Sequence, residues 1–134
     1  MSKYLVYDTE YEYWDCVIEA LVEMGYPRKV MLFSETEKQS LYGHQGDIRS
    51  QKANLVIPRR HVGRAANDLG FEMVNGKIIM HLSEYDKSNT FTRYKQNKLK
   101  ALYKKHTILK AAKKQKKKVK VTNKDGKIKM EIYA

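Results

Sequence analysis

Hydrophobic positions near the start of the chain follow two successive periods. Residues 3–7 are mostly apolar and prone to extended structure, which predicts a first strand. A helix is then predicted from Thr9, because Glu12 follows it at the spacing of a capping box. The apolar residues of this helix recur at helical spacing and form one face; they are Trp14, Val17, Ile18, Leu21 and Val22. Gly25 is expected to end the helix.

The middle of the chain carries weaker signals. Residues 28–33 predict a second strand, and residues 34–46 are polar and irregular, with a short strand expected at 41–42. Residues 53–57 predict another strand, which Pro58 ends because proline has no N–H for the sheet. A basic loop is expected to follow.

Two β-hairpins are predicted with clear turns. Asn75-Gly76 separates strands expected at 69–74 and 77–82, and this dipeptide is the strongest short hairpin signal. The second hairpin joins 117–122 to 127–133 around a turn that ends in Asp125-Gly126. Its alternation predicts one apolar face, formed by Val119, Val121, Ile128, Met130 and Ile132. The other face is expected to be basic, with Lys118, Lys120, Lys127 and Lys129.

A long helix is predicted over about residues 91–115. Its inner stripe is marked by Phe91, Leu99, Leu102, His106, Leu109 and Ala112, and lysines cover the remainder. Two helices among several hairpin-linked strands predict an α+β fold, in which helices cover one side of a mostly antiparallel sheet. The expected order is β-α-β-β-β-β-α-β-β.

Charge is distributed unevenly along the chain. Its 134 residues carry a formal charge of +12. Residues 1–89 hold 11 basic and 13 acidic side chains, whereas residues 90–134 hold 16 basic and 2 acidic ones. A chain of this length fits one domain, so we expect a single nucleic-acid-binding domain over 1–134 whose lysine-rich helix and hairpin occupy 90–134. Such a cationic block repels itself unless an anionic partner neutralises it.

We predict that the basic segment forms a ridge that contacts nucleic-acid phosphates with little sequence specificity. The ridge residues are Lys104, Lys105, Lys110, Lys113, Lys114, Lys116, Lys117, Lys118 and Lys120. Arg59, Arg60 and Arg64 could add bidentate phosphate contacts or form a solvated loop. Tyr94 and Tyr103 could stack on bases, and packing in the core is the alternative for Tyr103.

A resemblance is carried by three spaced segments. They are Leu41-Tyr42-Gly43-His44-Gln45-Gly46, Lys52-Ala53-Asn54-Leu55-Val56-Ile57 and Asp68-Leu69-Gly70-Phe71-Glu72. With the long helix and the Asp-Gly turn that follow, the chain resembles the uncharacterised family typified by a conserved chloroplast and cyanobacterial reading frame. The chain departs from the family pattern by its basic stretch at 59–67 and by the lysines of its final helix.

The resemblance implies a partner. Large phages that build a protein-bounded replication compartment carry members of this family, including an RNA-binding protein associated with the shell of the phage nucleus. RNA, above all phage mRNA in the cytoplasm of an infected bacterium, is therefore the expected ligand, with single-stranded DNA as a further candidate. Self-association and binding to the phage shell protein are further expected partnerships. The resemblance transfers no catalytic residue to this chain.

Other classes of function have less support in the sequence. The four histidines and Cys16 lack the spacing of metal ligands, and no acid, base and nucleophile stand together, so neither an enzyme nor a cofactor is expected. The Gly43-x-x-Gly46 spacing resembles the clamp loop of KH domains, but it lies between predicted strands and reads as a turn. No apolar stretch approaches the ~20 residues of a membrane span, and no membrane partner is expected. The alternative function is a basic adaptor for an acidic protein or the ribosome.

Overall fold

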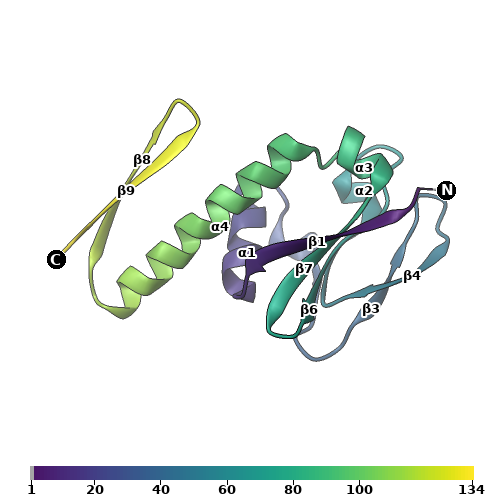
Figure 1. Cartoon of the computed structure of the whole chain (residues 1–134), viewed down its shortest axis with the longest axis horizontal. Coiled ribbons are helices and arrows are strands. Elements are labelled where there is room, and N and C mark those ends of the chain that lie inside the picture. Colours follow the sequence, from purple (N-terminus) through teal and green to yellow (C-terminus); the bar gives the residue numbers. More distant parts are fainter. Residues whose placement is uncertain (1) are drawn as a thin grey trace.

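The computed structural model describes residues 2–134 and has an α+β fold, as predicted (Figure 1). Its strands are β1 Tyr4–Tyr11, β2 Leu32–Phe33, β3 Gln39–Tyr42, β4 Ile48–Ala53, β5 Leu55–Ile57, β6 Leu69–Val74, β7 Lys77–Ser83, β8 Lys118–Lys124 and β9 Lys127–Tyr133. Its helices are α1 Trp14–Glu23, α2 Arg59–Val62, α3 Glu84–Asn89 and α4 Arg93–Lys114, with a 3₁₀ turn η1 at Arg28–Val30. All strand pairs in this part of the chain are antiparallel. The fold therefore contains more short helices and strands than the sequence predicts.

A five-stranded sheet in the order β1-β7-β6-β5-β2 forms the centre of the molecule. The hairpin β6–β7 lies where Asn75-Gly76 predicts it, and both turn residues have positive φ, 50° and 81°. This is the conformation of a type I′ turn, whose twist matches that of the flanking strands. β1 pairs only with β7, so it is an edge strand of the sheet.

Different elements cover the two faces of this sheet. Side chains from α1 and α4 join one face in the main core, whose largest fully buried members include Phe71, Phe91 and Leu99. The hairpin β3–β4 covers the other face, where Tyr4 and Leu41 lie in a smaller cluster. Gly70 permits this contact, because a Cβ there would lie 2.9 Å from Leu41 and from the Cβ of Ala53. The helices α1 and α4 therefore lie on one side, as predicted.

The predicted start of the first helix is wrong. Thr9 belongs to β1, where its hydroxyl accepts a hydrogen bond from Tyr11 N–H at 2.9 Å and donates to the Ile78 carbonyl. These bonds stabilise an irregularity in the pairing of β1 with β7, so the Thr9 side chain supports the sheet and caps no helix. The predicted end is confirmed, since Gly25 adopts φ 105° after the last turn of α1.

The middle of the chain is more ordered than its sequence pattern indicates. The segment 28–33 begins as the turn η1 and only its end forms β2. The strand β4 was not predicted. Its more buried positions are occupied by Arg49 and Gln51, so its sequence lacks the alternation of apolar and polar residues that marks a strand. The strand predicted at 53–57 is divided at Asn54, whose buried side chain donates to the Ser34 carbonyl at 3.0 Å. The Gly43–Gly46 segment is the turn between β3 and β4, as expected.

Buried polar groups fix the segment around α2, which was predicted as a loop. Asp68 accepts hydrogen bonds from the N–H groups of Tyr42 and Arg59 at 2.8 and 2.7 Å. Burial raises the pKa of Asp68, and these two donors oppose the rise. Asp86, at the start of α3, is 1% exposed and accepts from Asn67 N–H at 2.9 Å. Two carboxylates therefore anchor the chain on either side of the basic residues of α2.

Candidate nucleic-acid interface

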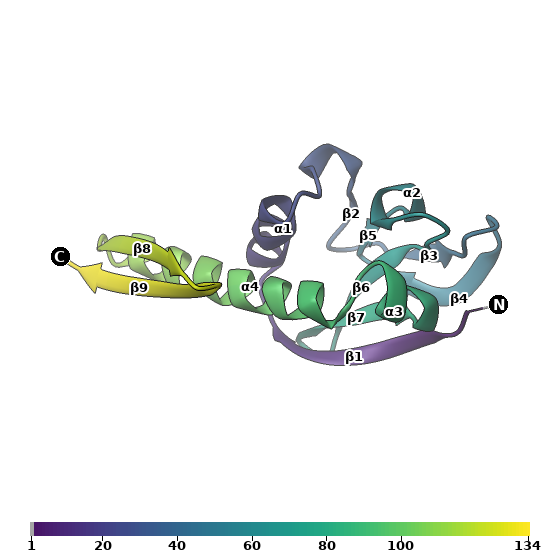
Figure 2. The same cartoon turned by 90° about the horizontal axis from the view of Figure 1, so that it is seen from above.

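The C-terminal hairpin β8–β9 stands apart from the sheet, beside the C-terminal half of α4, in two perpendicular views (Figures 1 and 2). Its turn is Asp125-Gly126, both with positive φ, so Asn123 and Lys124 belong to β8. The strand register places one set of lysines on a single face of the ribbon. This hairpin lysine face consists of Lys118, Lys120, Lys124, Lys127 and Lys129.

The hairpin lysine face is exposed and has little internal compensation. Lys124 lies directly opposite Lys127 in the register, and like charges in that position destabilise a ribbon. Within residues 2–134, Lys129 is the only member of the face with an ion pair, to Glu131 at 3.7 Å. The face therefore concentrates positive charge that Glu131, opposite Lys120 in the register, neutralises only in part.

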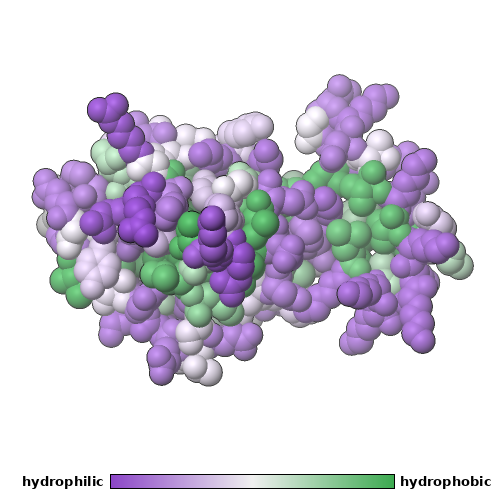
Figure 3. All heavy atoms as spheres, turned by 180° about the vertical axis from the view of Figure 1, so that it is seen from behind, coloured by the Kyte–Doolittle hydropathy of each residue, from purple (hydrophilic) through white to green (hydrophobic). Residues whose placement is uncertain are grey.

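The other face of the ribbon carries the predicted apolar residues. Ile128 packs against the main core, and Val119, Val121 and Met130 are half-buried. Ile132 remains 53% exposed, and hydrophobic side chains are visible at this end among hydrophilic ones (Figure 3). α4 therefore covers the apolar face only in part.

The turn between α4 and β8 places further lysines beside this ribbon. Lys116 has φ 56°, a left-handed conformation that usually belongs to glycine at a helix end. Its N–H donates to the Lys113 carbonyl at 3.0 Å, and Lys117 N–H donates to the Ala112 carbonyl at 2.8 Å. This Schellman motif joins the last turn of α4 to the hairpin. We call the exposed cations from Lys113 to Lys129 the lysine end.

Two lysines of the predicted ridge are held by α1. Lys105 donates to Glu23 at 2.8 Å and its side chain is only 17% exposed. Lys110 pairs with Asp15 at 2.9 Å and lies 4.5 Å from the centre of the Tyr13 ring. The ridge is therefore narrower than predicted. These pairs also engage two acidic residues of α1, Glu23 and Asp15.

The contact between Glu23 and α4 predicts a pH dependence of stability. Partial burial tends to raise the pKa of Glu23, but hydrogen bonds from Lys105 and His106 outweigh it and lower the pKa below its ordinary value. The folded-state pKa is thus below the unfolded one, at about 4.3. The stability from this contact is present above that pH and is lost as the pH falls through the folded pKa.

We expect the thermal midpoint of the protein to fall more steeply on acidification from about pH 5 to about pH 3 than that of Glu23→Gln. Circular dichroism at a series of pH values measures this difference. Glu19→Gln is the matched control, because Glu19 is an exposed acid of α1 with no ion pair in residues 2–134. Equal slopes for the protein and Glu23→Gln would contradict the assignment.

The two tyrosines singled out by sequence differ in exposure. Tyr103 is 7% exposed, and its hydroxyl accepts hydrogen bonds from Glu12 and Tyr13 N–H at 2.8 and 3.2 Å. Its ring lies 4.5 Å from that of Tyr11, so it packs in the core and has no free face for a base. Tyr94 is 73% exposed at the start of α4 and remains accessible.

The arginines lie at the end of the molecule opposite the lysine end. They belong to α2 and the loop after it, whereas β8 and β9 lie at the other extreme of the long axis (Figure 1). Arg59, Arg60 and Arg64 form no ion pair within residues 2–134. Their cations are available to a ligand. They do not share one surface with the C-terminal lysines, although the sequence left that arrangement open.

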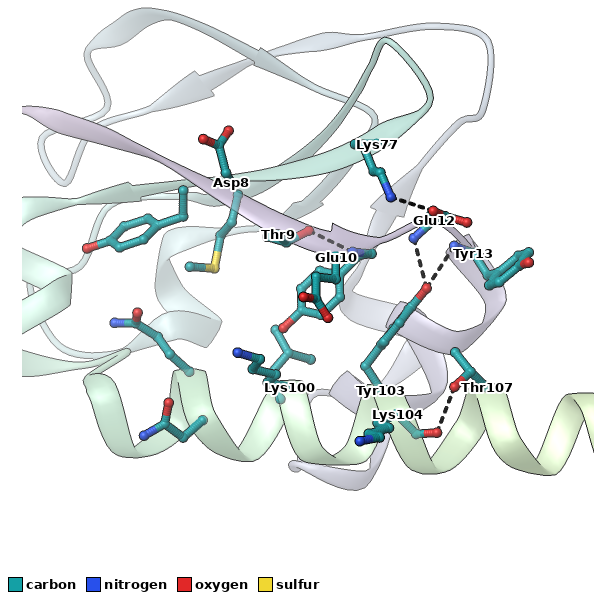
Figure 4. Close-up of a pocket in the computed structure, with 16 residues that line it drawn as sticks. Asp8, Thr9, Glu10, Glu12, Tyr13, Lys77, Lys100, Tyr103, Lys104 and Thr107 are labelled. Carbon is teal, nitrogen blue, oxygen red and sulfur yellow. Dashed lines mark hydrogen bonds and ion pairs between the residues drawn. The ribbon is translucent and has the colours of Figure 1, made fainter.

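A groove of about 950 Å³ runs between β1 and α4 (Figure 4). Tyr7, Met80 and Leu99 contribute apolar lining. Lys100 and Lys104 lie on the α4 wall, and acidic residues of β1 lie on the other wall. The groove therefore adjoins the basic helix with a polarity of its own.

Sequence reasoning missed the residues of this groove as a site. Lys100 was expected only as one of the lysines covering the helix, and Glu10 was hidden by the predicted helix over the end of β1. Asn97 lines the groove from α4 together with Lys100 and Lys104, but nothing in the sequence around it indicates a site. Strand alternation from Tyr7 to Tyr11 puts Glu10 on the same face as Asp8, so it gives no signal that Glu10 lies beside α4. The β1–β7 pairing is irregular between Tyr7 and Tyr11, and no local pattern reveals this.

Other chemistry has little basis in the described residues. Cys16 is 3% exposed, and burial, together with the Asp15 carboxylate, raises the pKa of its thiol to about 11. The thiol therefore stays protonated and poorly nucleophilic at neutral pH. Residues 2–134 bring no three His, Cys, Asp or Glu side chains together as metal ligands. None of the helices in this part of the chain has the length and apolar character needed to cross a membrane.

Comparisons with known proteins find no relative. No model of a protein family matches the chain, and neither curated proteins nor solved structures give a match. The interpretation of the lysine end therefore depends on its own geometry and charge.

Proposed function

We propose that the protein binds RNA through phosphate contacts made by the lysine end. The observation that carries this proposal is the hairpin lysine face, whose five cations lie on one side of an exposed ribbon. Lysines two residues apart on a strand are separated by about 7 Å, and their flexible side chains can follow a phosphate backbone without fixed geometry. Binding of this kind releases counterions and carries little sequence information.

RNA is preferred over DNA in this proposal because of the resemblance to a family with RNA-binding phage members. In that setting the ligand would be phage mRNA in the cytoplasm of an infected bacterium, near the phage replication compartment. Phosphate contacts alone do not distinguish the two nucleic acids, so single-stranded DNA belongs in the test.

A second candidate is an adaptor for an acidic protein, and a separate observation favours it. The ribbon face toward α4 leaves Ile132 53% exposed beside lysines of the last turn and hairpin. An acidic segment with a few apolar residues would neutralise the charge and cover this side chain. Competition between RNA of mixed sequence and polyglutamate for the labelled protein separates the two candidates.

We expect fluorescence anisotropy to show binding of labelled single-stranded RNA with a steep dependence on salt. Neutralising about five phosphates gives a log–log slope of about −3.5 for a single strand. Single-stranded and duplex DNA measured in the same salt series show whether contacts beyond phosphate contribute. Absence of RNA binding at low salt would overturn the proposed function and favour the acidic-protein adaptor.

A further inference from the structure

The groove between β1 and α4 contains polar groups that the protein leaves unused. Glu12, Thr9 and Tyr103 line it, but each is engaged in hydrogen bonds within the fold. Five other charged or amide side chains of the lining have no hydrogen-bond or ion-pair partner within residues 2–134; they are Asp8, Glu10, Asn97, Lys100 and Lys104. The hydroxyl of Tyr7 is buried and also lacks a partner.

These unused groups are sorted by sign across the groove. Lys100 projects from α4, and Glu10 faces the groove from β1, whereas Asp8 points away from the helix (Figure 4). A simple anion would be repelled by one wall and a simple cation by the other. The groove therefore suits a ligand with a negative group on one side and a hydrogen-bond donor on the other.

A nucleotide with an exocyclic amino group has this polarity. Its phosphate can contact the ammonium groups of Lys100 and Lys104, while a carboxylate can accept a hydrogen bond from the amino group of the base. The groove volume of about 950 Å³ falls at the upper end of the range of ligand pockets, roughly 300–1,000 Å³. Tyr7 is half-buried on the groove wall and can offer apolar surface to a face of the base.

The groove and the lysine end are connected by one element. α4 carries Lys100 and Lys104 on the groove wall and continues to Lys113 and Lys114 beside the hairpin. Tyr13 also lines the groove, is 46% exposed and contacts Lys110, whose ammonium group is paired with Asp15. A single strand held at the lysine end can therefore extend along α4 to the groove.

We infer that the groove binds an unpaired nucleotide of the RNA strand and favours bases with an exocyclic amino group, such as cytosine, over uracil. The Glu10 carboxylate accepts a hydrogen bond from the amino group, and Lys100 contacts the adjoining phosphate. Uracil presents a carbonyl oxygen where cytosine presents the amino group, so it would place an acceptor against the carboxylate. The inference rests on the proposed function and adds a preference that phosphate contacts cannot provide.

The test compares labelled cytidine and uridine oligonucleotides of equal length by fluorescence anisotropy at one salt concentration. We expect the protein to bind the cytidine strand about fivefold more tightly, as one added hydrogen bond of about 1 kcal/mol predicts. Glu10→Gln should reduce this ratio to near one. Glu10 is exposed and has no bond to the rest of the fold in residues 2–134, so the substitution should leave folding unchanged.

Glu19→Gln is the matched control. It removes the same negative charge from an exposed position outside the groove. It should therefore change the affinity for both strands by the same factor and retain the preference for cytidine. Cytidine monophosphate, added as a competitor, separates a free nucleotide from a nucleotide within RNA. The monophosphate is added at the same concentration of cytidine as the oligonucleotide contains. If it displaces the strand at that concentration, the ligand is a free nucleotide and not a nucleotide within RNA.

The outcomes separate this inference from the proposed function. Equal affinity for both strands, or a preference that persists in Glu10→Gln, overturns the groove assignment and leaves RNA binding intact. Failure of both strands to bind at low salt overturns RNA binding and the groove assignment together.

Discussion

Reversing the charge of Lys116, Lys117 and Lys118 to glutamate should weaken RNA binding by about a hundredfold at 0.1 M salt. Each phosphate contact on a single strand contributes about 0.7 to the salt slope, which is about fivefold in affinity between 1 M and 0.1 M salt. Loss of three contacts therefore lowers the slope by about two as well. Anisotropy titrations with two unrelated RNA sequences measure both quantities, and the loss should be the same for each sequence.

The matched control reverses three exposed lysines on the body of the protein, Lys29, Lys52 and Lys87, none of which has an ion pair in residues 2–134. It changes net charge by the same amount at sites outside the lysine end. Affinity should fall much less in this control. If the two triple variants lose affinity equally, general charge governs binding and the lysine end is no distinct surface.

Replacement of Trp14 by alanine should lower the free energy of unfolding by roughly 3–5 kcal/mol. Trp14 begins α1, is 8% exposed and lies in the main core, with its ring 5.2 Å from that of Phe33. Truncation leaves a cavity between α1 and the strand β2. Urea unfolding followed by circular dichroism should show an earlier midpoint with an unchanged slope.

Tyr94→Ala is the comparison for this variant, because it removes a large aromatic side chain that is 73% exposed. Its unfolding midpoint should stay close to that of the unchanged protein. A shift as large as that of Trp14→Ala would show that aromatic truncation is costly irrespective of burial. If the midpoint of Trp14→Ala equals that of the unchanged protein, Trp14 does not contribute to the core as described.

Local chemistry explains what the sequence predicts well. The dipeptides Asn75-Gly76 and Asp125-Gly126 accept positive φ, and each folds its own flanking strands together without help from distant residues. The same holds for Gly25 at the end of α1. The α+β class follows from these hairpins and the period of α4.

Distant partners explain what the sequence predicts poorly. Thr9 and Glu12 have capping-box spacing, but pairing with β7 extends β1 to Tyr11 and takes the Thr9 hydroxyl into the sheet. The polar strand β4 exists because it covers Tyr4 and Gly70 on a face that no local pattern reveals. Tertiary contacts override local preference at both places.

The candidate site divides in the same way. Lysine density locates the lysine end from sequence alone, because charge needs no partner to be recognised. Whether a given lysine is free depends on α1, and only the fold shows that Lys105 and Lys110 are paired with its acids. The groove needs the end of β1 and α4 to lie side by side, although their residues are about ninety positions apart. The hydrogen bond from Glu12 N–H to the Tyr103 hydroxyl shows this proximity.

The left-handed turn at Lys116 has an energetic consequence for this end of the molecule. A side chain in that conformation costs roughly 1–2 kcal/mol relative to an ordinary helical one, and glycine would avoid most of the cost. A lysine there adds an ammonium group between α4 and the hairpin at the expense of conformational stability. The junction is thus less stable than its hydrogen bonds alone would make it. An anion that pairs with Lys116 in the folded protein would stabilise the junction and offset part of this cost.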